Sequence, residues 1–212
     1  MSKFDYNIII IGGGSAGLVS AYIGSTIKAK VALIENHKMG GDCLNTGCIP
    51  SKALIRSTKI LSYIRRHQEF GIKSASAEFN FSEIMERVQS IIKKIAPHDS
   101  IERYTNLGVN CFSGFAKILS PNQVDINGKI LTTKNIIIAT GAKPTIPAIR
   151  GLDKVGFLTT DNLWNIRELP KRFCILGGGP IGVELSQCFS RLGSKVTLIE
   201  MMPNILIRED DE

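Results

Sequence analysis

Residues 8–17 read Ile-Ile-Ile-Ile-Gly-Gly-Gly-Ser-Ala-Gly, and this stretch decides the fold of the chain. Its isoleucines end a short, β-branched and apolar run over residues 4–11, which is typical of a buried parallel strand. Residues 18–27 then predict a helix, and residues 31–34 predict a second strand that Glu35 closes. The sequence therefore predicts a βαβ unit with the pattern G-x-G-x-x-G in its first turn and an acidic residue about twenty positions on.

This combination favours a dinucleotide site over an ordinary tight turn. The glycines let the backbone approach a pyrophosphate, which lies at the helix N-terminus, and the acid bonds a ribose hydroxyl. A glycine pattern by itself is weak evidence, but here the strand, the helix and the acid all accompany it. The residues expected at this first site are Gly12, Gly14, Ser15, Ala16, Gly17, Glu35 and Asn36.

The same unit returns late in the chain. Residues 173–176 predict a strand, a second glycine pattern comes next, and residues 195–200 repeat the pattern of residues 30–35. The distance from first glycine to acid is 23 positions in both copies, so we predict an internal repeat and a second dinucleotide. The residues expected at the second site are Gly177, Gly179, Pro180, Ile181, Gly182 and Glu200. Glu200 would accept a ribose 2′-OH and repel a 2′-phosphate, which favours NAD(H) over NADP(H).

Two cysteines, Cys43 and Cys48, lie five positions apart in Gly-Gly-Asp-Cys-Leu-Asn-Thr-Gly-Cys-Ile-Pro-Ser-Lys, residues 40–52. A disulfide needs Cα atoms within about 6.8 Å, whereas five steps of regular helix rise about 7.5 Å. Cys43 is therefore predicted in a loop or distorted turn, and a helix is predicted from near Cys48 to about Phe70. Cys48 would then lie at a helix N-terminus near Lys52, and both features favour a thiolate.

Three interpretations of this pair compete. The cysteines could be buried and inert, they could be half of a zinc site, or they could form a redox-active disulfide. Cys111, Cys174 and Cys188 stand alone in the sequence and no second Cys/His pair exists, so no metal site is predicted. The glycines, Pro50 and Lys52 around the pair fit the redox-active disulfide best.

Residues 40–52 resemble the active-site signature of the pyridine nucleotide–disulfide oxidoreductases, the group of dihydrolipoamide dehydrogenase, glutathione reductase and mercuric reductase. The resemblance implies FAD in the first site and a reversible Cys43–Cys48 disulfide. It implies that Cys48 lies nearer the flavin. It also implies that Cys43 exchanges with an external dithiol or disulfide, either a small molecule or a protein-bound one. A dihydrolipoamide dehydrogenase-like enzyme is the first expectation, with a mercuric reductase-like enzyme or a flavin-binding module without turnover as alternatives.

The resemblance extends to residues outside the cysteine motif. It implies that Lys52 and Glu184 pair beside the flavin, so the expected catalytic residues are Cys43, Cys48, Lys52 and Glu184. Binding a pyrophosphate does not require Glu184, and a solvent-facing helix glutamate is the ordinary alternative. The further flavin contacts that the resemblance implies are Gly41, Asp42, Lys52, Gly114, Ala116, Ala139, Thr140 and Gly141.

The remaining segments complete the predicted α/β fold. Residues 81–106 predict a long helix that Ser82 caps and Pro97 interrupts. Short strands are predicted at residues 107–112, 114–118, 123–126, 129–131 and 136–138, with a hairpin turn at Asn127-Gly128. We therefore expect an FAD/NAD(P)-binding fold, with two Rossmann-like dinucleotide-binding units and a small antiparallel β-meander insertion. Residues 1–145 would form an FAD domain, and residues 146–212 would begin an NAD(P)H domain, with a linker at residues 143–151 across this boundary.

Composition bounds the remaining possibilities. The chain has 212 residues, is 43% hydrophobic and 21% charged, which is ordinary for a globular protein. No apolar run approaches the roughly 18 residues of a membrane helix, and residues 1–5 are no signal peptide, so we expect a cytoplasmic protein. The net charge of +7 is scattered along the chain, which argues against a nucleic-acid partner. The resembled enzymes have further domains, so we also expect a fragment of a longer, homodimeric enzyme, inactive by itself.

Overall fold

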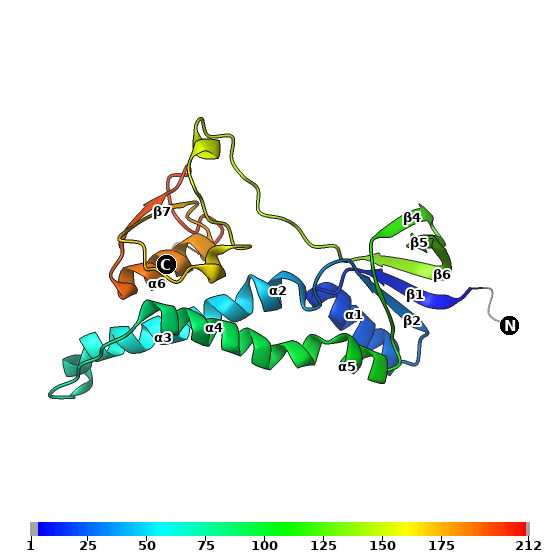
Figure 1. Cartoon of the computed structure of the whole chain (residues 1–212), viewed down its shortest axis with the longest axis horizontal. Coiled ribbons are helices and arrows are strands. Elements are labelled where there is room, and N and C mark those ends of the chain that lie inside the picture. Colours follow the sequence, from blue (N-terminus) through cyan, green and yellow to red (C-terminus); the bar gives the residue numbers. More distant parts are fainter. Residues whose placement is uncertain (1–3, 211–212) are drawn as a thin grey trace. The chain divides into compact units, whose positions relative to one another are not determined.

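The computed structural model describes residues 4–210 and contains a six-stranded mixed sheet in the order β3-β2-β1-β6-β5-β4 (Figure 1). Strands β3, β2, β1 and β6 run parallel, whereas β6, β5 and β4 pair antiparallel. The α/β class and the antiparallel segment are therefore confirmed. The strands are β1 (Tyr6–Ile11), β2 (Val31–Glu35), β3 (Asn110–Ser113), β4 (Ala116–Ser120), β5 (Gln123–Ile126) and β6 (Lys129–Ile138).

The consecutive isoleucines of β1 serve both faces of this sheet, because successive side chains in a strand point to opposite sides. Ile9 is fully buried in a cluster with Val124, Ile126 and Leu131 of the antiparallel segment. Ile10 is fully buried in the opposite cluster, which includes Leu18 and Ala21 of α1 (Ser15–Thr26). Burying each isoleucine contributes about 1.5–3 kcal/mol, so an apolar run without alternation is what this central position requires.

Strand β6 differs from the sequence prediction of two separate strands at residues 129–131 and 136–138. The structure joins them into one strand of ten residues. Residues 132–135 are Thr-Thr-Lys-Asn, which contain no glycine or proline to turn the chain, and the two threonines suit a strand. The first half of β6 pairs with β5 and the second half with β1, so one strand carries the chain from the meander into the parallel part.

The helical segment has the predicted order with three corrections. It comprises α2 (Gly41–Asn45), α3 (Cys48–Arg65), a 3-10 turn at His67–Phe70, α4 (Phe81–Ile95), a 3-10 turn at Ala96–Asp99 and α5 (Ile101–Asn106). The interruption at Pro97 is confirmed. Cys43 lies in the short helix α2 and not in a loop, and α3 ends five residues before Phe70. Ser82 is not the cap of α4, because the Asn80 side chain accepts the Ser82 N–H at 2.9 Å.

Contacts divide the chain into two compact units, Met1–Ile49 with Ile92–Asp161, and Pro50–Ile91 with Asn162–Glu212. The second unit holds a parallel pair, β7 (Arg172–Leu176) and β8 (Lys195–Ile199), joined by α6 (Pro180–Leu192). Phe189 of α6 is fully buried, with ring centroids 4.4 Å from Phe173 and 6.1 Å from Phe81 of α4. Residues 139–149, which include most of the predicted linker, contain no helix or strand, and the division into domains at residue 145 remains a prediction.

Candidate functional site

The first glycine loop comes directly after β1 and is formed by close backbone contacts. Gly12 has φ +111°, and a Cβ on it would lie 2.1 Å from the carbonyl oxygen of Ala139. A Cβ on Gly17 would lie 1.8 Å from the carbonyl oxygen of Gly12. Neither position accepts a side chain, because the loop backbone lies in direct contact with Ala139 after β6 and with the first turn of α1. This is the cradle that the glycine pattern predicts.

The Glu35 carboxylate is bound to backbone at both oxygens. Its Oε2 accepts the Gly13 N–H at 2.5 Å, and its Oε1 accepts the His37 N–H at 2.7 Å. The Glu35 carbonyl accepts the Gly114 N–H at 2.9 Å, which joins the end of β2 to the turn after β3. Glu35 thus lies against the glycine loop, as the motif requires, and its contact with a ribose remains a prediction.

The predicted residues of the first site lie at or just beyond the carboxyl ends of β1, β2, β3 and β6, except Ala116, which begins β4. Ligands of open α/β sheets bind in the crevice outside these ends. Ala139 leaves β6 beside β1, where its N–H donates to the Ile11 carbonyl at 2.8 Å. At α1, whose N-cap is Gly14, no side chain of the described part of the chain caps the first turn, and that turn holds no acidic residue. The N–H groups there therefore suit a pyrophosphate, so these residues fit the adenosine and pyrophosphate parts of FAD. The set is Gly12, Gly14, Ser15, Ala16, Gly17, Glu35, Asn36, Gly114, Ala116, Ala139, Thr140 and Gly141.

The cysteine segment is attached directly to this loop. The Gly40 N–H donates to the Gly13 carbonyl at 2.8 Å, and a Cβ on Gly41 would lie 2.6 Å from the Cα of Gly14. The Asn45 amide donates to the carbonyls of Met39 at 3.1 Å and Gly41 at 2.8 Å, which holds α2 in this place.

The two cysteines lie on either side of a break between helices. Cys43 is half-buried in α2, and Cys48 is exposed as the first residue of α3. The predicted break is therefore confirmed, and Gly47 lies in it, where a Cβ would stand 3.0 Å from the Asp42 carbonyl oxygen. Pro50 lies in the first turn of α3, where a missing N–H costs nothing. The disulfide itself remains a prediction.

The second glycine loop repeats the geometry of the first. Gly177 has φ +103°, and a Cβ on Gly182 would lie 1.9 Å from the Gly177 carbonyl oxygen. The Glu200 Oε2 accepts the Gly178 N–H at 2.5 Å, and its Oε1 accepts the N–H groups of Met201 and Met202 at 2.7 and 2.8 Å. These backbone donors, the Met202 N–H foremost, lower the pKa of the Glu200 carboxyl. The two loops are therefore equivalent in structure as well as in sequence.

The predicted ion pair between Lys52 and Glu184 is not made in this structure. Within residues 4–210 the ion pairs are Arg66–Glu69 at 3.1 Å and Arg167–Glu86 at 2.7 Å. Lys52 on α3 and Glu184 on α6 are both exposed. Water solvates both charges there, so neither needs a partner to offset desolvation.

Comparison with known proteins decides the family. The sequence model of the pyridine nucleotide-disulphide oxidoreductase family matches residues 6–212. The chain belongs to this family. The dihydrolipoyl dehydrogenase of Acholeplasma laidlawii is 42% identical over 217 residues, which cover 100% of this chain and 64% of that protein. The mercuric reductase of Bacillus cereus is 35% identical over 210 residues, which cover 99% of this chain and 33% of that protein.

Solved structures agree with this membership. The HOCl-induced flavoprotein disulfide reductase RclA from Escherichia coli matches with a TM-score of 0.81 and 30% sequence identity, over 97% of this chain and 44% of that one. The chain thus spans between a third and two thirds of the length of these family members.

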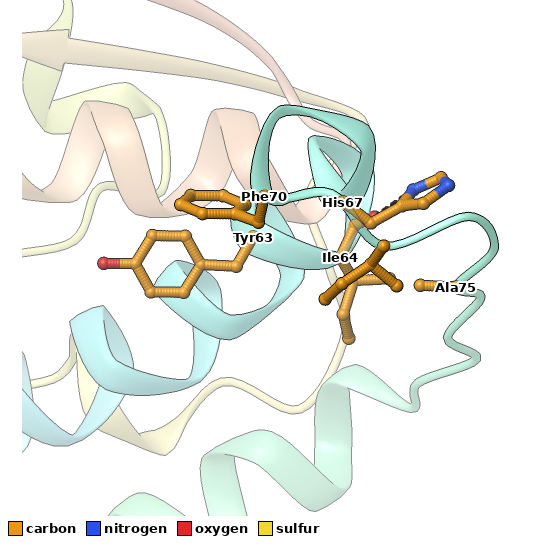
Figure 2. Close-up of a pocket in the computed structure, with 6 residues that line it drawn as sticks. Tyr63, Ile64, His67, Phe70 and Ala75 are labelled. Carbon is orange, nitrogen blue, oxygen red and sulfur yellow. Dashed lines mark hydrogen bonds between the residues drawn. The ribbon is translucent and has the colours of Figure 1, made fainter.

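Other features of this family member lie outside the predicted site. A hollow of about 430 Å³ is lined by Tyr63, Ile64, His67, Phe70, Ile72 and Ala75, none of which is a predicted site residue (Figure 2). Among residues 4–210, no group of three or more His, Cys, Asp or Glu residues could hold a metal ion. None of the helices described is long and apolar enough to cross a membrane.

Sequence reasoning missed the contacts that hold the second glycine of each loop. Gly13 and Gly178 occupy the unspecified second position of the glycine pattern. Each nevertheless donates its N–H to its acid and accepts a backbone N–H at its carbonyl. The donor to the Gly13 carbonyl is Gly40, whose place at the start of the cysteine motif is a usable signal. The donor to the Gly178 carbonyl is Leu206, and nothing in the sequence marks that residue.

Proposed function

We propose that this chain is the FAD-binding and NAD(H)-binding part of a disulfide oxidoreductase of the dihydrolipoyl dehydrogenase type. The observation that carries the proposal is the attachment of α2 to the first glycine loop. Gly40 bonds the Gly13 carbonyl and Gly41 lies against Gly14, so a dinucleotide on that loop would lie next to the helix of Cys43. A pyrophosphate site beside a pair of cysteines suits a flavin that exchanges electrons with a disulfide.

The cofactor of the first site is FAD and not FMN, because Glu35 at the end of β2 serves an adenosine ribose. Bound FAD supplies the transfer of an electron pair between a nicotinamide and a disulfide. The residues proposed for FAD are those at the carboxyl ends of β1, β2, β3 and β6, together with Gly41, Asp42 and Lys52. The second loop, with Gly177, Gly179, Pro180, Ile181, Gly182 and Glu200, binds NAD(H), and its carboxylate disfavours the 2′-phosphate of NADP(H).

The cysteines carry the exchange with substrate. Cys48 begins α3, and Cys43 lies in α2 on the other side of the break between the two helices. In the reduced pair, the Cys43 sulfur would attack one sulfur of the external disulfide and release the first thiol. The Cys48 sulfur would then attack Cys43 in this mixed disulfide, which releases the second thiol and reforms Cys43–Cys48, and the two cysteine protons pass to the two released thiols. Lys52 and Glu184 would lie beside the flavin in the loaded enzyme, where the Lys52 charge would stabilise negative charge on the cofactor. The full-length enzyme would be a homodimer with its FAD domain in residues 1–145.

Because this chain is expected to be inactive by itself, the experiment is reconstitution of the full-length enzyme with FAD followed by anaerobic NADH. We expect stoichiometric flavin, loss of its absorbance on NADH addition, and turnover with lipoamide. Cys43→Ser and Cys48→Ser should keep the flavin and lose turnover, whereas Cys174→Ser, at an exposed position outside the motif, should keep both. Retained turnover in Cys43→Ser would contradict the proposal.

Mercuric reductase-like activity is the second candidate, because the Bacillus cereus mercuric reductase matches nearly the whole chain at 35% identity. The same preparation distinguishes the two candidates. NADH oxidation that depends on Hg(II) and not on lipoamide favours the second candidate, and oxidation that depends on lipoamide favours the first.

A further inference from the structure

The second glycine of each loop makes one hydrogen bond through its N–H and another through its carbonyl, and we call this pair of bonds the clamp. The Gly13 N–H donates to Glu35 Oε2 at 2.5 Å, and the Gly13 carbonyl accepts the Gly40 N–H at 2.8 Å. The Gly178 N–H donates to Glu200 Oε2 at 2.5 Å, and the Gly178 carbonyl accepts the Leu206 N–H at 2.8 Å. Both glycines are buried. The same clamp therefore recurs in two copies of the unit whose donor segments have unrelated sequences.

The residues that donate to the two glycine carbonyls, Gly40 and Leu206, also share a backbone conformation. Gly40 has φ +85°, and Leu206 has φ +55°, so both lie in the left-handed region. Leucine adopts that region rarely, because its Cβ crowds the following carbonyl. The second βαβ unit nevertheless keeps Leu206 in this conformation, which indicates that the hydrogen bond to the Gly178 carbonyl outweighs the backbone strain.

The segment after the donor differs between the copies. After Gly40 the chain forms α2, which carries Cys43 and which Asn45 fastens to Met39 and Gly41. After Leu206, residues 207–210 contain no cysteine and form no helix or strand. In the first βαβ unit, the clamp on Gly13 therefore connects Glu35 to α2, the helix that carries Cys43.

We propose that Glu35 is a positioning residue for Cys43, in addition to its part in dinucleotide binding. The N–H and the carbonyl of Gly13 flank one Cα, and glycine has no side chain to fix its backbone angles. The two clamp bonds therefore set the orientation of Gly13. Loss of the Glu35 carboxylate leaves the buried Gly13 N–H without its acceptor, and the backbone must turn to find another. That turn moves the Gly13 carbonyl away from Gly40 and releases α2.

This inference rests on the proposed role of Cys43, and its test requires neither flavin nor turnover. The whole chain, without dinucleotide, is first reduced, so that any Cys43–Cys48 disulfide is opened, and the reductant is then removed. It is followed by amide hydrogen exchange with mass spectrometry and by the rate of Cys43 alkylation with iodoacetamide. The matched variants are Glu35→Ala and Glu200→Ala, which remove the same carboxylate from equivalent loops. Glu35→Ala should speed exchange in residues 40–46 and alkylation of Cys43 by about tenfold, because a charged hydrogen bond to a buried group is lost. Glu200→Ala should speed exchange in residues 201–207 and leave Cys43 alkylation within about twofold of the unmodified chain.

The inference is supported by a crossed pattern, in which each variant speeds exchange beside its own loop and only Glu35→Ala speeds Cys43 alkylation. The inference is overturned if Glu35→Ala loosens only residues 12–17, or if Glu200→Ala speeds Cys43 alkylation as much as Glu35→Ala does. Should Glu35→Ala not fold, Glu35→Gln keeps one acceptor oxygen and should show a smaller acceleration in residues 40–46, and no acceleration overturns the inference. FAD retention by the unmodified chain is measured separately. A crossed pattern in a chain that never retains FAD upholds the positioning role while the proposed function fails.

Discussion

Gly14 and Gly41 lie backbone against backbone, and a Cβ built on Gly41 would stand 2.6 Å from the Gly14 Cα. Gly14 caps α1, and Gly41 begins α2. No side chain separates the first glycine loop from the helix that carries Cys43. This contact makes the dinucleotide loop and the cysteine segment one structural element, which is the basis of the proposed flavin and disulfide chemistry.

Gly41→Ala should remove retained FAD and destabilise the chain more than Gly71→Ala does. Gly41 and Gly71 have φ +53° and +73°, so alanine is strained at both, but a Cβ on Gly71 meets nothing within 4 Å. The shared strain costs about 1–2 kcal/mol, and the contact with Gly14 adds roughly 1–3 kcal/mol. Urea unfolding and the flavin-to-protein ratio measure the two effects. Equal values for the two variants would show that the close contact has no consequence.

Gly17→Ala and Gly182→Ala should separate the two dinucleotide sites. In each case the new Cβ would meet the carbonyl of the first loop glycine, at 1.8 Å from Gly12 and 1.9 Å from Gly177. Gly17→Ala should lose FAD, whereas Gly182→Ala should keep FAD and lose NADH binding. Flavin content and NADH fluorescence titration check this. Loss of FAD in both variants would contradict the assignment of one cofactor to each loop.

Glu200 should titrate below an ordinary glutamate, because three backbone N–H groups bond its ionised form and lower its pKa. Its unfolded pKa is about 4.3, and the folded pKa is lower, so ionised Glu200 stabilises the loop above the unfolded pKa. That stabilisation is lost as the pH falls through the folded pKa. Carboxyl carbon NMR gives the midpoint, and Glu200→Gln identifies the signal. A midpoint at or above the unfolded value would refute the expected hydrogen bonding.

Phe189→Ala should lower the free energy of unfolding by about 3–5 kcal/mol, because a fully buried aromatic side chain leaves a cavity. Its ring contacts both Phe173 of β7 and Phe81 of α4. Phe157→Ala is the control, since Phe157 is 41% exposed and should cost far less. Urea unfolding measures both. Similar losses in the two variants would mean that α4 and the second βαβ unit do not share a core.

The repeated glycine units could be predicted from sequence because their information is local. Gly12 and Gly177 each come directly after an apolar strand, and Glu35 and Glu200 each close the next one at the same spacing. The break between Cys43 and Cys48 could also be predicted, because helix geometry sets the distance across five residues. Both inferences depend only on neighbours along the chain.

The features that sequence could not reveal depend on distant contacts. Phe81 and Phe189 meet across more than a hundred residues, so the packing of α4 with the second βαβ unit leaves no local pattern. Leu206 takes a left-handed conformation to close the clamp on Gly178, although leucine rarely adopts it. The Lys52–Glu184 pair is not made in this structure, where both side chains are exposed, and its formation in the flavin-loaded enzyme remains a prediction.

The central claim is that Cys43 and Cys48 form a disulfide that accepts electrons through the flavin. Peptide mass spectrometry of the FAD-loaded chain, alkylated without reductant before and after anaerobic NADH, tests it most directly. We expect a Cys43–Cys48 disulfide peptide before NADH and two alkylated cysteines afterwards, with Cys111, Cys174 and Cys188 unchanged. Cys43 and Cys48 alkylated to the same extent before and after NADH would contradict the claim.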